Sequence, residues 1–160
     1  MEKEELSQLA SDFRKAIERV IEKRNDPYDM LLGFPRGKCG FASSLFQRYL
    51  HEQFGEEVLY VNTPRDCPES HAWLETDKEI IIDITGDQYF DRENEFFCNI
   101  PVYVGALDDF HKAFGKCEKS YYVEHGASPF KDDSSLKIDK TYETIINEMS
   151  LMVETETDDK

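Results

Sequence analysis

The sequence predicts an α+β fold in which helices pack against one mainly antiparallel sheet. Apolar residues recur at steps of three and four near both ends of the chain, which is the pattern of amphipathic helices. Shorter β-rich segments separated by Pro, Gly and Asp occupy the middle. At 160 residues, 39% of them hydrophobic, the chain is long enough to form a core, and we expect a single domain over residues 1–153.

Four helices are expected, two of which have clear end signals. Gly55 suits the end of the second helix, and Asp108 and Gly115 suit the N-cap and the end of the short third helix. An acidic, frayed tail is expected over residues 154–160. The predicted helices cover residues 4–23, 42–54, 108–114 and 139–153.

Five strands are expected between the second and last helices. Residues 86–99 show no clear period and are expected to be irregular. The predicted strands cover residues 57–62, 71–75, 79–85, 101–104 and 119–124, and the predicted loops cover residues 28–38, 63–69 and 126–138.

The second and third strands are predicted to form a hairpin around a three-residue turn at 76–78. In that register His71 lies opposite Asp83, and Trp73 lies opposite Ile81, so that all four side chains share one face. The other face is then wholly apolar, whereas a slip of one residue would mix the two faces. The residues of this predicted apolar face are Ala72, Leu74, Ile80, Ile82 and Ile84.

The charge and the cysteines limit the classes of function. The net charge of −15 argues against binding to nucleic acid or to an anionic membrane surface, both of which need Lys and Arg. No signal peptide or transmembrane segment is recognisable, so a cytoplasmic location is expected. The four cysteines, at positions 39, 67, 98 and 117, form no Cys-x-x-Cys pair and are expected to be free thiols.

Three residues in chain order have the chemistry of a catalytic triad. Cys39 opens the second helix, where exposed N–H groups and the helix dipole favour a thiolate. His71, on a strand, suits a general base, and Asp83, on the neighbouring strand, suits a carboxylate that orients the imidazole. Asp87 is the rival for the third role.

Further residues are candidates for binding the substrate or the oxyanion. They are Arg36, Gly37, Trp73 and Gln88, together with the backbone N–H of Cys39. Arg36 recognises a substrate carboxylate or simply pairs on its loop, and Trp73 lines the cleft or packs in the core. His51 and His111 are interpreted as structural.

Residues 35–40, 70–73 and 82–87 together resemble the transglutaminase-like branch of the papain-like cysteine enzymes. The resemblance rests on the order Cys, His, Asp and on the elements expected to carry them, and it implies a papain-like core. The chain lacks the Gln that precedes the papain cysteine. It also has Phe41 where arylamine N-acetyltransferases have Glu, which argues against a coenzyme A site.

The expected function is cysteine-dependent acyl transfer on an amide or thioester, with a peptide or protein as substrate. Hydrolysis and transfer to an amine both remain open, as does the oligomeric state. No metal and no cofactor are expected, because close ligand pairs and cofactor fingerprints are missing. The alternatives are a catalytically inactive protein-binding module on the same fold and a zinc-binding protein that uses Cys39, His71 and Asp83.

Overall fold

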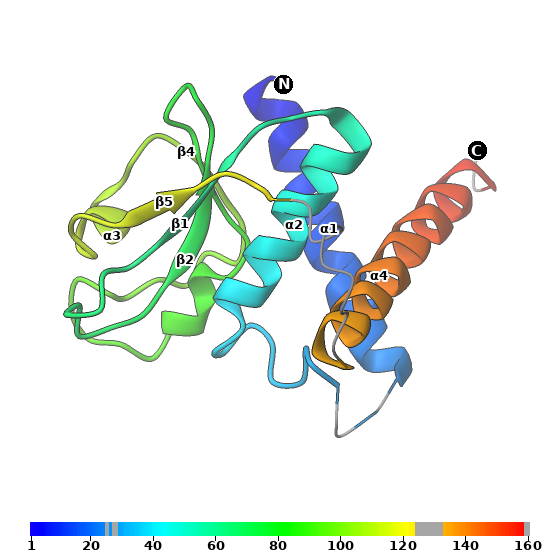
Figure 1. The fold of residues 1–160 in the computed structure, drawn as a ribbon, viewed down its shortest axis with the longest axis horizontal. Coiled ribbons are helices and arrows are strands. Elements are labelled where there is room, and N and C mark those ends of the chain that lie inside the picture. The colour runs from blue at the N-terminus through cyan, green and yellow to red at the C-terminus, as the bar shows by residue number, and fades with distance from the viewer. Residues whose placement is uncertain (25, 27–28, 124–132, 159–160) are drawn as a thin grey trace. The chain divides into compact units, whose positions relative to one another are not determined.

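The computed structural model has an α+β architecture with a five-stranded antiparallel sheet, as predicted (Figure 1). It describes residues 1–24, 26, 29–123 and 133–158. The chain divides into two compact units, one of residues 1–11 and 33–122 and one of residues 12–32 and 123–160. The sheet and all three residues of the predicted triad belong to the first unit.

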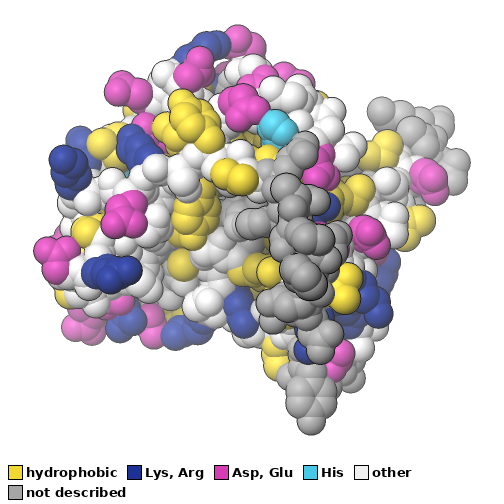
Figure 2. Space-filling view, in the orientation of Figure 1, with side chains coloured by type: hydrophobic (Ala, Val, Ile, Leu, Met, Phe, Trp, Pro, Cys, Tyr) yellow, Lys and Arg dark blue, Asp and Glu magenta, His cyan; other side chains and the backbone are white. Residues whose placement is uncertain are grey.

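Acidic and basic side chains are interspersed on the face of the molecule seen in Figure 2. The net charge of −15 is thus not gathered into one acidic patch on that face. Within the described residues, no helix is both long enough and apolar enough to cross a membrane.

The four predicted helices are present, although their ends differ from those expected. Gly55 ends α2 in the left-handed conformation with a φ of 65°, and Asp108 caps α3 by accepting a hydrogen bond from the His111 N–H. The last helix begins earlier and ends later than predicted, and it runs through residues 154–158, which the sequence assigned to a frayed tail. Residues 126–132 of the predicted loop lie outside the described part. The helices are α1 (Lys3–Arg24), α2 (Cys39–Phe54), α3 (Asp109–Lys112) and α4 (Asp133–Asp158), and a 3-10 helix, η1 (Gly86–Tyr89), lies in the segment expected to be irregular.

Each of the five predicted strands has a counterpart in the sheet, displaced or shortened at its ends. The strands are β1 (Leu59–Asn62), β2 (Ala72–Glu75), β3 (Ile81–Asp83), β4 (Tyr103–Gly105) and β5 (Glu118–Ser120). Their order in the sheet is β4-β3-β2-β1-β5, and every pair is antiparallel. His71 lies immediately before β2, and Asp83 is the last residue of β3.

The predicted hairpin register is wrong by two residues. Leu74 pairs with Ile82, so Trp73 and not His71 comes opposite Asp83. The turn lies one residue later than predicted: the Thr76 N–H donates to the Ile80 carbonyl at 3.0 Å, and Glu79 takes a φ of 58°. A shift of two residues preserves the side-chain alternation. His71 and Asp83 therefore share a face as expected, but as diagonal rather than direct neighbours.

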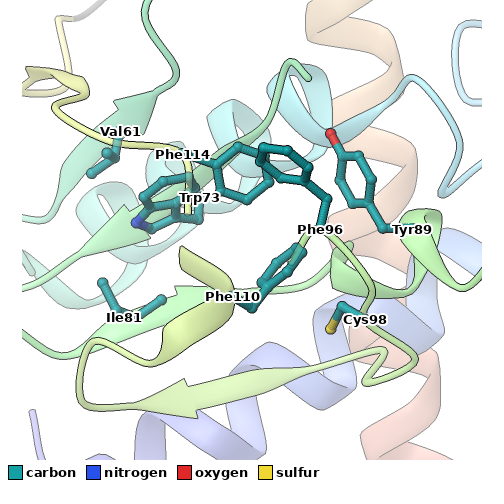
Figure 3. Packing of buried hydrophobic residues seen from close by; sticks show 8 residues of the cluster. All are labelled: Val61, Trp73, Ile81, Tyr89, Phe96, Cys98, Phe110 and Phe114. Atoms are coloured by element: carbon teal, nitrogen blue, oxygen red, sulfur yellow. The ribbon is translucent and has the colours of Figure 1, made fainter. Parts of the chain in front are cut away.

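The two faces of the sheet meet different partners. Helix α2 packs against β1 and β2, where the Ser43 hydroxyl donates to the Ala72 carbonyl at 3.2 Å. Figure 3 shows the rings of Trp73, Phe96, Phe110 and Phe114 gathered beside Val61 and Ile81. Because Val61 pairs with Trp73, these strand residues point to the same side of the sheet. Trp73 and Ile81 also share the His71 face, so the aromatic cluster surrounds the imidazole.

In the second unit, polar contacts join the C-terminal half of α1 to α4. Lys23 Nζ lies 2.5 Å from Glu148 Oε2, and Arg24 donates to Thr144 Oγ1 at 2.6 Å. Glu148 is buried. A carboxylate in that position requires a cationic partner, and Lys23 supplies it.

Candidate functional site

Cys39 is the first residue of α2 and is partly buried. No side chain caps this helix, so the N–H groups of its first turn are not taken up by a capping side chain. The helix dipole places partial positive charge at the same point. The start of α2 therefore favours a negatively charged sulfur.

His71 and Asp83 form a buried hydrogen-bonded pair. His71 Nε2 lies 2.7 Å from Asp83 Oδ2, and both side chains are 0% exposed. Asp83 Oδ1 accepts hydrogen bonds from the Thr85 N–H at 2.8 Å and from the Thr85 hydroxyl at 3.1 Å. The backbone N–H of His71 donates to Thr63 Oγ1 at 3.1 Å, which fixes the main chain at this residue. Together these bonds hold the His71 ring and the Asp83 carboxylate in one orientation.

Gln88 connects the imidazole to the loop that precedes Cys39. Its Oε1 accepts a hydrogen bond from the Gly37 N–H at 3.1 Å, which directs its amide NH₂ towards His71 Nδ1 at 2.7 Å. In the neutral imidazole, His71 Nδ1 accepts this hydrogen bond and the ring hydrogen lies on Nε2, facing Asp83. Nδ1 is therefore the ring nitrogen that takes the proton, in place of the hydrogen bond from Gln88, when His71 becomes an imidazolium. Two candidates from the sequence, Gly37 and Gln88, thus lie together beside His71.

The titration behaviour of Cys39 and His71 is that of an ion pair. Burial raises the pKa of the Cys39 thiol, but a hydrogen bond to His71, the charge of His71 and a hydrogen bond to Gln88 outweigh it and lower the pKa. Burial also lowers the pKa of His71, whereas the charge and hydrogen bond of Asp83 and the contact with Cys39 raise it to about 9. A thiolate beside an imidazolium is the reactive form of a catalytic cysteine.

Asp83 stays ionised despite its complete burial. Burial favours the neutral acid, but the charge of His71 and hydrogen bonds from His111 and His71 hold the pKa of Asp83 well below its usual range. The rival candidate, Asp87, lies in η1, and the carboxylate that bonds the His71 ring is that of Asp83.

Arg36 and Trp73 are placed differently from Gly37 and Gln88. Arg36 is 54% exposed, pairs with Asp91 at 3.1 Å and lies over the Phe90 ring at 4.8 Å. Trp73 is 3% exposed and packs in the aromatic cluster, with its ring centroid 5.6 Å from that of His71. Of the two interpretations offered for each, the structure shows loop pairing for Arg36 and core packing for Trp73.

Two further residues at the site have no clear signal in the sequence. His111 was interpreted only as structural, yet its Nε2 lies 3.3 Å from Asp83 Oδ2. Tyr60 reaches the start of α2, where its hydroxyl oxygen lies 3.0 Å from the position that a Cβ on Gly40 would take. Burial and the nearby Cys39 charge raise the pKa of Tyr60, so its hydroxyl keeps its proton. Neither contact joins residues close in sequence, which is why local patterns do not reveal them.

The ligand atoms of His71, Asp83 and His111 all lie within 4.8 Å of one another, so their chemistry suits a metal ion. The 2.7 Å separation of His71 Nε2 and Asp83 Oδ2 is nevertheless the length of a charge-assisted hydrogen bond. Hydrogen bonding accounts for the arrangement of these side chains without an ion.

The site therefore unites the start of α2, the residue before β2, the end of β3 and η1. Comparison of the chain with models of protein families, with curated proteins and with solved structures finds no match. The function has to be argued from the geometry and electrostatics of these side chains.

Proposed function

We propose that the protein is a cysteine-dependent acyl-transfer enzyme that acts on an amide or thioester, with a transglutaminase-like version of the papain-like core. One observation carries the proposal. Cys39, at the start of α2, has a lowered thiol pKa because it lies beside His71, whose other ring nitrogen is bound by buried Asp83. A cysteine kept only for packing has no need of a buried His–Asp pair.

In the proposed reaction the Cys39 thiolate attacks the carbonyl carbon of the substrate, and the carbonyl oxygen becomes an oxyanion. The backbone N–H of Cys39 and the Gln88 amide are the donors best placed to stabilise it. When the tetrahedral intermediate collapses, His71 gives its proton to the leaving amine or thiol, and an acyl thioester remains on Cys39. Asp83 holds the imidazole in position throughout.

Release of the acyl group uses the same residues in the reverse sense. His71 Nδ1 accepts a proton from water or from an amine as that nucleophile attacks the thioester, and the Cys39 thiolate leaves. Water gives hydrolysis, whereas an amine gives transfer. We expect a peptide or protein substrate, because Arg36 and the Phe90 ring are exposed on the segments that carry Gly37 and Gln88.

The test is to trap the acyl-enzyme. The purified protein is incubated with a panel of peptide thioesters, and intact-mass and peptide mapping locate any acyl group. We expect acylation at Cys39, release of the acyl group by water or by added primary amines, and loss of acylation in Cys39→Ala and His71→Ala. Cys67→Ala serves as a matched control, because Cys67 is also a partly buried free thiol.

Absence of acylation at Cys39 across the panel, with unchanged reactivity of the other thiols, contradicts the proposal. It would favour the inactive protein-binding module instead. The ratio of hydrolysis to amine transfer in the acylated protein then identifies the acceptor class.

A further inference from the structure

His111 is a buried histidine that the proposed mechanism does not use. Its side chain is 1% exposed and lies between two carboxylates. Nδ1 is 2.6 Å from Asp108 Oδ1, and Nε2 is 3.3 Å from Asp83 Oδ2. The same Asp108 oxygen accepts the His111 N–H at 2.9 Å, so the N-cap of α3 fixes both the backbone and the ring of His111.

These contacts have a definite direction. An ionised carboxylate only accepts hydrogen bonds, so in the contact with Asp83 the hydrogen lies on His111 Nε2. His111 then donates to Asp83 Oδ2, the oxygen that also binds His71. Asp108, His111, Asp83 and His71 form a continuous chain of alternating acceptors and donors that leads to Cys39.

We propose that His111 is a positioning residue for the Cys39 site, and that its Nε2–H holds the Asp83 carboxylate in the orientation that binds His71. The inference rests on the proposed function and deepens it. Asp83 Oδ1 is already bonded to Thr85, so Oδ2 is the oxygen shared by the two imidazoles. When the His111 hydrogen bond is lost, Oδ2 keeps only its bond to His71, and one of the contacts that hold the carboxylate in place is gone.

The neighbours of His111 allow its hydrogen bonding to be tested separately from its aromatic packing. Its ring stacks edge-on against Trp73 at 4.9 Å and lies 5.4 Å from Tyr103 and 6.2 Å from His71, measured between centroids. The charged groups that face it are Asp83 and Asp108, and the other ionisable rings beside it are those of His71 and Tyr103. A phenylalanine at this position would keep the aromatic packing but donate no hydrogen bond.

Two substitutions of His111 therefore distinguish a packing role from a positioning role. His111→Phe keeps an aromatic ring and removes both ring nitrogens. His111→Gln loses the ring but places an amide N–H near the position of Nε2, so it can still donate to Asp83. The readout is the alkylation rate of Cys39 by iodoacetamide against pH, followed by peptide mapping.

We expect His111→Phe to lower the Cys39 rate at pH 6 by about tenfold or more, which corresponds to a rise of about one unit in the thiol pKa. His111→Gln is expected to stay within about threefold of the wild type at that pH. The opposite ranking, or equal profiles for wild type and His111→Phe, overturns the inference. If the wild-type Cys39 itself shows no low-pH reactivity, the proposed function fails instead.

A second measurement needs no variant to fold. In the wild-type protein at pH 7, ¹⁵N NMR of the histidine rings is expected to show a hydrogen on His111 Nε2. A bare Nε2 on His111 would mean that it does not donate to Asp83, and it would overturn the inference independently of the alkylation data.

Discussion

At the scale of single residues, Gln88 performs two tasks with one amide group. Its oxygen accepts from the Gly37 N–H, and its nitrogen approaches His71 Nδ1 at 2.7 Å and hydrogen-bonds Cys39. An apolar side chain of similar length can do neither. Gln88 is therefore expected to influence the thiol before any substrate is bound.

Gln88→Met tests that expectation with a side chain of similar length. Because the Gln88 hydrogen bond lowers the pKa of the Cys39 thiol, its loss should move the pH profile of Cys39 alkylation to higher pH. The shift should be smaller than that in His71→Ala, since His71 contributes both a hydrogen bond and a charge. An unchanged profile would show that Gln88 does not contact the thiol in solution.

At the scale of elements, the β2–β3 hairpin stores strain at one position. Glu79 has a φ of 58°, a conformation that disfavours side chains with a Cβ and suits glycine. Gly55 takes nearly the same conformation, with a φ of 65° at the end of α2, and is already glycine.

The two positions make a matched pair of substitutions. Glu79→Gly should raise the free energy of unfolding by up to about 1 kcal/mol, because it removes the left-handed strain. Gly55→Ala should lower that free energy by about 1 kcal/mol for the converse reason. Urea denaturation measures both. A loss of stability in Glu79→Gly would mean that the turn is not left-handed at Glu79.

The same hairpin shows which features of the structure could be predicted from the sequence and which could not. Side-chain alternation correctly put His71 and Asp83 on one face, because a strand repeats every two residues. The turn contains no glycine, so nothing in the sequence revealed that Glu79 takes a positive φ, and the register was placed two residues away. The Cys39 position followed from the helix pattern and its preceding Pro and Gly. His111 was missed as a partner because its contact with Asp83 spans 28 residues.

At the scale of the whole molecule, the buried triad links stability to pH. The pKa of His71 is raised from 6.5 to about 9, so its contribution is fully present below about pH 6.5 and is lost as the pH rises through 9. The pKa of Asp83 is lowered, so its contribution is present above its ordinary pKa of 3.8 and is lost on acidification below that value. The two residues together stabilise the folded state most between about pH 3.8 and pH 6.5.

The alkaline limb can be isolated in a Cys39→Ala background, where the thiol no longer titrates. The free energy of unfolding of that variant should fall by about 2 kcal/mol or less as the pH rises above 6.5 and His71 loses its proton. The fall should be complete at a lower pH than with Cys39 present, because the contact with Cys39 that also raises the His71 pKa is gone. Adding Asp83→Asn should abolish most of this fall, because the charge that holds the proton is gone. Denaturant titrations at several pH values provide the comparison. Equal slopes for the single and double variants would contradict a charged His71–Asp83 pair.

The most direct test of the account is the rate at which iodoacetamide alkylates each cysteine as a function of pH. Cys39 is expected to react far faster than Cys67, Cys98 and Cys117 and to stay reactive below pH 7, because His71 lowers the pKa of its thiol. His71→Ala should remove that low-pH reactivity and leave the other three rates unchanged. If Cys39 instead reacts like an ordinary thiol, with a profile insensitive to His71, the protein does not contain an activated nucleophile and the proposed acyl transfer is wrong.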